Sequence, residues 1–467
     1  MNYSIGGVCL KGADEMKKYF SLLILLILMI SMLFSGCSLR LQGPENLMMP
    51  PRLQGDYQSL QDNFVKVVGT NTNLITPSNG ELKSAFIIDD FDSDSNEDAM
   101  VFYSARSTDE MINIALFEKK GSDWTYVKTV KGVGTSVDSV KLEDLNNDGI
   151  KEVIVGWNVY SNKLLCIYEP SKDKSANYFS DIGTYQYSQF SVYDIDSDGD
   201  SEIFFVNLDS ASILPSASAV AVDISKDLKS TEVISEIPLD GNISGYSRLY
   251  IGKSDGKPVF YADAYKNEHD MITEVVFWDS KNKTLFAPLF EAETQTTTST
   301  WRNCRMPILD IDSDGEYEIP VGVEVEGSEV VSAGELLDEQ LYYIRWSGLK
   351  NQKLKAEKYT LYNFSEGYCF DVPSSWVGKV TINSLDSQWY FYRWNASSSE
   401  HMGNLLLSIV SHSEGSTGID GYKSLTHFSE KAFEYQISLS GTGFGITDDY
   451  VKKNFQMITD RTGGILE

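Results

Sequence analysis

Four short segments of the sequence place oxygen-bearing side chains at the same positions, 1, 3, 5 and 9. The segments begin at Asp90, Asp144, Asp194 and Asp310. A hard divalent cation such as Ca²⁺ takes about six to eight oxygen ligands, so each segment predicts one ion site and the chain about four. The predicted ligands are Asp90, Asp92, Asp94, Asp98, Asp144, Asn146, Asp148, Glu152, Asp194, Asp196, Asp198, Glu202, Asp310, Asp312, Asp314 and Glu318.

The residues around the acids limit which known type of calcium loop these segments can form. Glycine occupies position 6 in three segments, where the lack of a Cβ permits a conformation that other residues resist, and Ser95 stands there in the first. Position 12 is Val or Phe in every segment, which excludes EF-hand and dockerin loops because these need an acid there. An alternative is that the acids only stabilise turns through Asx hydrogen bonds. Clustered carboxylates without a cation would, however, repel one another.

The segments recur along the chain and indicate an internal repeat. Their starts are 54, 50 and 116 residues apart, so the last interval is about twice the others. A degenerate copy lies midway, because Ile251–Val259 keeps Ser254-Asp255-Gly256 in register but has Ile, Lys and Val at positions 1, 3 and 9. We interpret it as a repeat that kept its turn and lost its ion.

Strand-forming residues flank the acidic segments, as in Phe190–Tyr193 before the third and Ile203–Val206 after it. Each segment is therefore expected to connect two strands. Further strand candidates fill each period, and three or four strands in about 40–60 residues is what a propeller blade needs. We predict a mainly β protein, with a β-propeller of five to seven blades over residues 59–362.

The acidic loops and their period resemble the FG-GAP or VCBS repeats, which form the calcium-loop blades of integrin alpha-chain propellers and of many bacterial surface proteins. The resemblance covers roughly residues 60–350. It implies that the sixteen residues named above are Ca²⁺ ligands. It also implies a structural role for the ions, since their ligands hold adjacent strands together.

The N-terminus has the features of an exported precursor. Lys17 and Lys18 precede the apolar run Tyr19–Phe34, which ends in Ser35-Gly36-Cys37. This end resembles the bacterial lipobox, which implies a signal peptide over residues 1–36, lipid on Cys37 and a tether over residues 37–58. The alternative is an uncleaved membrane anchor, although sixteen apolar residues are short for a spanning helix. Both alternatives place residues 38–467 outside the cytoplasm, attached to the cell membrane.

Composition limits the function classes. The chain has 39 Lys and Arg against 67 Asp and Glu, a net charge of −28, which excludes a generic nucleic-acid binder. The widely spaced Cys166, Cys304 and Cys369 form neither a disulfide framework nor a zinc motif. The acidic loops stop after about residue 362, and residues 363–467 predict a small α+β domain of unknown function.

The expected function is that of a non-enzymatic, lipid-anchored surface protein that presents its loops to a protein or glycan partner. One alternative is a lyase or hydrolase acting on extracellular polysaccharide, which would require acid and base residues outside the ion loops. A factor that assists envelope assembly is a third possibility. The fold alone cannot decide among these, because one fold hosts many functions.

Overall fold

The computed structural model describes residues 55–467, apart from 106–110, 172–177, 212, 226–229, 338, 398–400, 417 and 460–467. The predicted signal peptide, Cys37 and most of the predicted tether lie outside the described residues. The last residues of that tether belong to helix α3 (Gly55–Val68). Within the described part of the chain, no helix is long and apolar enough to span a membrane.

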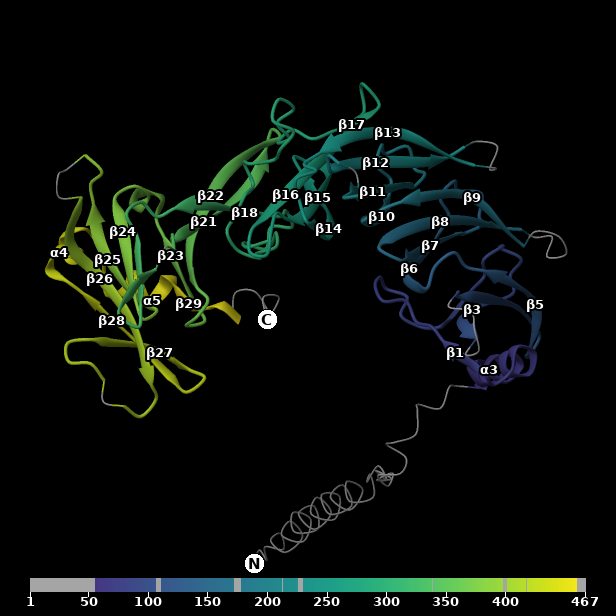
Figure 1. Ribbon diagram of the computed structural model, residues 1–467, viewed down its shortest axis with the longest axis horizontal. Coiled ribbons are helices and arrows are strands. Elements are labelled where there is room, and N and C mark those ends of the chain that lie inside the picture. The colour runs from purple at the N-terminus through teal and green to yellow at the C-terminus, as the bar shows by residue number, and fades with distance from the viewer. Residues whose placement is uncertain are drawn as a thin grey trace, which may run out of the picture. The chain divides into compact units, whose positions relative to one another are not determined.

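The prediction of a mainly β protein is confirmed. Internal contacts divide the chain into residues 1–62 and 63–467, and all sheets among the described residues lie in the second unit. Two successive repeats form four-stranded antiparallel sheets in chain order, with their strands side by side in Figure 1. These strands are β6 (Ser136–Glu143), β7 (Glu152–Val159), β8 (Asn162–Pro170), β9 (Phe179–Gln186), β10 (Gln189–Tyr193), β11 (Glu202–Asp209), β12 (Ser216–Ile224) and β13 (Thr231–Leu239).

The flanking repeats follow the same plan with small additions. In the first, β1 and β2 both pair with β3, and the degenerate repeat forms the sheet β14-β15-β16-β17. The strands of these two sheets are β1 (Thr72–Leu74), β2 (Phe86–Asp89), β3 (Asp98–Ala105), β4 (Asn113–Lys120), β5 (Asp123–Lys131), β14 (Gly245–Ser254), β15 (Lys257–Tyr265), β16 (Met271–Asp279) and β17 (Thr284–Phe286).

Buried side chains join each sheet to the next. On β7, Val155 packs in a cluster with Phe102 of the first sheet, whereas the adjacent Ile154 packs in a cluster with Phe205 of the third. Successive side chains of a strand point to opposite faces, so β7 is buried on both faces. This explains why the second strand of a repeat is a continuous apolar run instead of an alternating one.

Consecutive packing of four-stranded sheets is one requirement of a propeller, and ring closure is another. Among the described residues no closed barrel or propeller is found. The prediction of five to seven blades therefore stays a prediction.

Two further sheets contain the C-terminal third of the chain. One has the order β18-β21-β22-β23-β29 and the other β20-β19-β24-β25-β26-β28-β27. Their strands are β18 (Ile319–Glu324), β19 (Glu329–Ser332), β20 (Glu335–Leu337), β21 (Tyr342–Lys350), β22 (Lys353–Asn363), β23 (Tyr368–Val372), β24 (Val380–Leu385), β25 (Gln388–Trp394), β26 (Met402–Ser413), β27 (Lys423–Phe428), β28 (Lys431–Ile437) and β29 (Phe455–Met457).

The predicted domain boundary between residues 362 and 363 falls inside one of these sheets. Strand β22 itself crosses the boundary and pairs with β23, and β19 on the N-terminal side pairs in parallel with β24. Residues 363–467 contain strands together with the short helices α4 (Leu439–Gly443) and α5 (Asp448–Asn454). The hydrogen bonds do not mark a boundary there, and a separate C-terminal domain stays a prediction.

Candidate metal centres

Each acidic loop joins strands in the same register. Three of the loops connect two consecutive strands that pair with each other: β2 to β3, β6 to β7 and β10 to β11. The residue before position 1 pairs with the residue at position 9 in all four loops. These pairs are Asp89 with Asp98, Glu143 with Glu152, Tyr193 with Glu202 and Leu309 with Glu318.

Backbone geometry within the loops also repeats. Positions 4 and 6 have positive φ angles in every loop, including Ser95 with φ 71°, so serine adopts the conformation that glycine provides elsewhere. In the first loop Asp90 Oδ1 accepts the N–H of Asp94 at 3.1 Å and Asp90 Oδ2 accepts that of Ser95 at 3.0 Å. The second and fourth loops repeat this pattern. Such bonds fold the backbone of these three loops around the carboxylate at position 1.

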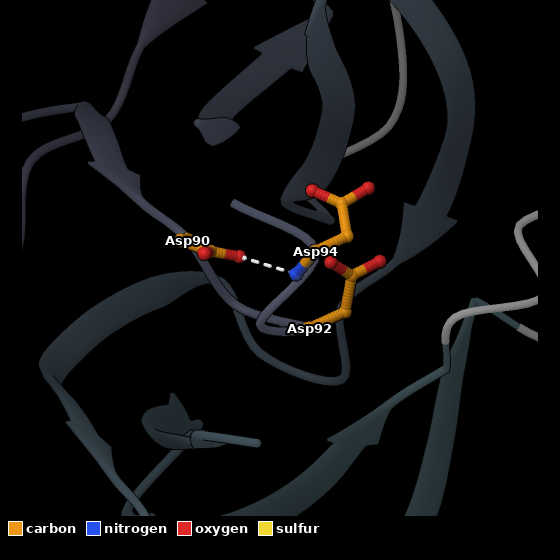
Figure 2. A group of neighbouring side chains, drawn as sticks. All are labelled: Asp90, Asp92 and Asp94. Carbon is orange, nitrogen blue, oxygen red and sulfur yellow. Dashed lines mark hydrogen bonds between the residues drawn. The ribbon is translucent and has the colours of Figure 1, made fainter. Parts of the chain in front are cut away.

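Three loops bring acidic ligands close enough to hold a metal ion. In each, carboxylate oxygens from three residues lie within 4.8 Å of one another. Figure 2 shows the first cluster, where Asp90 bonds to the backbone of Asp94 and the carboxylates of Asp92 and Asp94 lie on the same side of the loop. The clusters are Asp90, Asp92 and Asp94, then Asp194, Asp196 and Glu202, then Asp310, Asp312 and Glu318.

The second loop differs in its ligand chemistry. Asn146 stands at position 3, and its Nδ2 lies 3.5 Å from Glu152 Oε1. Within the described residues, the acids of this loop do not form a group of three with oxygens close enough to hold an ion. Asp144, Asp148 and Glu152 nevertheless accept backbone N–H groups of the loop, as the equivalent residues of the fourth loop do. The remaining predicted ligands make backbone contacts, as Asp198 and Asp314 do with the N–H two residues on. Asp98 accepts the N–H of Phe91 at 3.2 Å.

The glutamates at position 9 are buried carboxylates that face the loops. Glu152, Glu202 and Glu318 are 0%, 3% and 2% exposed. One oxygen of each accepts the N–H of position 2, at 2.7–2.8 Å. Burial raises the pKa of Glu152 to about 7, of Glu202 to about 8 and of Glu318 to about 7, and neighbouring carboxylates add to the rise. A bound cation would offset these shifts, because a nearby positive charge favours the charged form of a carboxylate.

Asp194 in the third loop is a second sign that a cation fits. Its Oδ1 is buried and has no hydrogen-bond partner in the structure. A buried carboxylate oxygen without a partner costs free energy. Together with Asp196 and Glu202 it forms an all-oxygen donor set, which suits a hard cation.

The degenerate repeat has a tight hairpin where the other repeats have acidic loops. Residues Ser254–Lys257 form the turn between β14 and β15, with φ 51° at Asp255 and 75° at Gly256. Asp255 Oδ2 accepts the N–H of Asn351 at 2.8 Å, and the Ser254 hydroxyl donates to the carbonyl of Leu349 at 3.0 Å. This turn is fixed by the β21–β22 hairpin, so it needs no ion.

A buried ion pair that no sequence motif predicts positions the segment before the fourth loop. Arg302 Nη2 lies 2.9 Å from Asp263 Oδ1, and both side chains are inaccessible to solvent. Asp263 Oδ2 accepts the N–H of Ile308 at 3.1 Å, two residues before Asp310. Neither residue belongs to a motif, and only the fold brings them together.

A groove of about 510 Å³ lies along β6 and β10. One of its lining residues is the buried Asp138. Burial raises the pKa of Asp138, but hydrogen bonds from Tyr187, Lys163 and Asn79 lower it, and the net effect is a lowered pKa. Asp89, also in the groove, pairs with Lys151 at 2.7 Å. Both carboxylates are paired with lysines, Asp89 with Lys151 and Asp138 with Lys163, which suits hydrogen bonding to a ligand better than general acid catalysis.

The three cysteines in the described part of the chain show no sign of reactivity. Among the residues that the structure describes, Cys166, Cys304 and Cys369 are not joined by disulfide bonds, and Cys166 and Cys369 are buried. Cys304 lines a second hollow of about 430 Å³, where burial raises the pKa of its thiol to about 11. A thiol protonated at neutral pH is a weak nucleophile.

Comparisons with known proteins add little. No protein-family model and no curated protein matches the chain. Among solved structures it is similar to a Bacillus licheniformis rhamnogalacturonan lyase, with 12% identity and a TM-score of 0.27 over 53% of this chain and 57% of the lyase. It is also similar to a hypothetical protein from Leishmania major, with 16% identity and a TM-score of 0.24 over 56% of this chain and 89% of that one. Likenesses at these scores carry no argument about function.

Proposed function

We propose that this chain is a lipid-anchored, extracytoplasmic Ca²⁺-binding protein that acts as a binding or scaffold module at the cell surface. The observation that carries the proposal is the recurrence of one acidic loop, in one strand register, four times along the chain. A single acidic loop would be weak support. Four loops in phase favour a shared ligand.

Calcium suits these loops better than other common cations. The side-chain donors are oxygens, without any His or Cys at positions 1, 3, 5 and 9. Ca²⁺ accepts such sets at about 2.3–2.6 Å in flexible geometry, whereas Mg²⁺ demands a near-ideal octahedron and keeps several waters. The buried glutamates at position 9 would supply the innermost carboxylates, and the side-chain oxygens at positions 1, 3 and 5 would complete the set of ligands.

A structural role for the ions follows from where the loops lie. Three of the loops close the turn between paired strands, so an ion there would fix the strand ends and neutralise carboxylates that otherwise repel one another. Carboxylates that bind the ions would not be available for catalysis. We therefore propose about four structural Ca²⁺ ions in a propeller of the FG-GAP type.

The lipid anchor and the surface location rest on the N-terminal sequence. The basic pair Lys17 and Lys18, the apolar run and Cys37 support export and lipid attachment. The partner is proposed to be a surface protein or a glycan. The groove along β6 and β10, with Asn79, Gln189 and Phe190 among its lining residues, offers the hydrogen bonds and aromatic surface that a glycan would use.

Ion stoichiometry tests the calcium part of the proposal. The metal-free protein should take up about four Ca²⁺ ions per chain in equilibrium dialysis. The double variant Asp312→Asn/Asp314→Asn should bind about one ion fewer, because it removes two negative charges while keeping oxygens that accept the same backbone N–H groups. The control is Asp255→Asn, which alters the ion-free turn and should leave the count unchanged. Wild-type protein that binds no Ca²⁺ would contradict the proposal.

A glycan panel separates a binding module from an enzyme. The Ca²⁺-loaded protein should retain surface polysaccharides or their fragments without changing their length. Incubation with the same polysaccharides should release no new reducing ends and no unsaturated products. Steady product release would favour the alternative of a polysaccharide lyase or hydrolase.

A further inference from the structure

The first and second acidic loops are tied to each other by hydrogen bonds. The N–H of Lys151, at position 8 of the second loop, donates to the carbonyl of Phe91, at position 2 of the first, at 3.1 Å. The hydroxyl of Ser93, at position 4 of the first loop, donates to the carbonyl of Gly149, at position 6 of the second. Each loop thus fixes backbone that lies between the other's predicted ligands.

The second and third loops are tied by equivalent atoms. The N–H of Ser201 donates to the carbonyl of Leu145 at 3.2 Å, again from position 8 to position 2. Asn147 Nδ2 donates to the carbonyl of Gly199 at 2.7 Å, again from position 4 to position 6, and to Asp200 Oδ1 at 2.6 Å. The same connection occurs twice with different side chains, which makes a chance contact a poor explanation.

This series of contacts stops at the degenerate repeat. The turn at Ser254–Lys257 has contacts with Leu349 and Asn351 instead of with the third loop. Unlike Asn147, the position 4 residues Ser197 and Ser313 make no hydrogen bond to another acidic loop within the described residues. The fourth loop is therefore separate from the first three.

Loops joined in this way should share the cost of becoming ordered. An ion that orders one loop also fixes the backbone at positions 2, 6 or 8 of its neighbour, so the next ion meets a loop that has already lost part of its conformational entropy. Coupling of this kind typically changes affinity by about 5- to 150-fold. The expected sign is positive, because ion binding and the hydrogen bonds favour the same loop conformation.

We propose that the first three loops bind their ions as one coupled unit and that the fourth binds independently. Ser93 and Asn147 are the positioning residues that connect the loops. This inference rests on the proposed Ca²⁺ binding, for which buried Glu202 and the unpartnered oxygen of Asp194 are the strongest support.

A Ca²⁺ titration of the whole protein, followed by calorimetry or by competition with a chromophoric chelator, tests the coupling. Wild-type protein should show three ions binding with a Hill coefficient of about 2 and one ion binding without cooperativity. In the variant Ser93→Gly/Asn147→Gly the coefficient should fall toward 1, because only the backbone bonds from Lys151 and Ser201 then connect the loops, and affinity at these three sites should weaken by about fivefold or more. Glycine tolerates the positive φ angles of 54° and 55° at these positions, so the backbone is not strained.

The matched control is Ser197→Gly/Ser313→Gly, which changes position 4 of the third and fourth loops and should keep the wild-type isotherm. Ser93→Asn should also keep the wild-type isotherm, because Asn147 shows that an amide at position 4 reaches the carbonyl at position 6 of the next loop. Ca²⁺ binding with identical isotherms in the wild type and the Ser93→Gly/Asn147→Gly variant would overturn the coupling alone. No Ca²⁺ binding in any protein would instead overturn the proposed function.

Discussion

Saturating Ca²⁺ should raise the thermal midpoint of the metal-free protein by on the order of 10 °C. A ligand that binds only the folded state adds about 2.7 kcal/mol per site at 100 times its Kd, so four sites would add about 10 kcal/mol. The buried glutamates at position 9 give the physical reason, because without a cation they remain poorly solvated and next to other carboxylates. Calorimetry or circular dichroism with chelator and then with excess Ca²⁺ measures the shift.

Two comparisons make this result specific. Mg²⁺ at the same concentration should raise the midpoint less, because it dehydrates reluctantly and fits an irregular cage poorly. The Asp312→Asn/Asp314→Asn variant should keep about three quarters of the Ca²⁺-dependent gain in free energy, because one of four sites is lost. Coincident melting curves with chelator and with Ca²⁺ would show that the acids stabilise turns without an ion.

The candidate sites could be predicted from the sequence because their information is local. Spacing within nine residues fixes which oxygens converge, and the flanking apolar runs, as around the loop from Asp194 to Glu202, fix the strands that the loop joins. The degenerate copy at Ile251–Val259 could be found by its interval, and it forms the tight turn at Ser254–Lys257.

Contacts between repeats could not be predicted in the same way. The bonds from Ser93 to Gly149 and from Asn147 to Gly199 join residues more than fifty positions apart, and serine or asparagine at position 4 is common in any turn. The pairing of β22 with β23, which joins the two sides of the predicted boundary between residues 362 and 363, could not be predicted either, because each segment has the pattern of an ordinary strand. Ring closure depends on still longer-range packing, for which a single sequence carries no local signal.

Arg302→Met should destabilise the protein by about 3–5 kcal/mol, because it leaves Asp263 as an unpaired buried charge. Arg302 also donates through Nε to the carbonyl of Met306 at 2.5 Å and through Nη1 to the hydroxyl of Thr273 at 3.0 Å, so the segment before the fourth loop loses several contacts at once. Denaturant unfolding in saturating Ca²⁺ measures the loss. The control is Arg305→Met, an exposed arginine that donates to the carbonyl of Glu268 and should cost less than about 1 kcal/mol.

The double variant Arg302→Met/Asp263→Asn separates the charge from the packing. Asparagine keeps an oxygen that can accept the N–H of Ile308 but carries no charge, so the double variant should be more stable than Arg302→Met alone by about 1 kcal/mol or more. If the double variant is less stable than the single one, the cost of Arg302→Met lies in lost hydrogen bonds and volume. Equal losses in Arg302→Met and Arg305→Met would show that the buried pair does not hold this segment in place, and the fourth loop would then need another source of support.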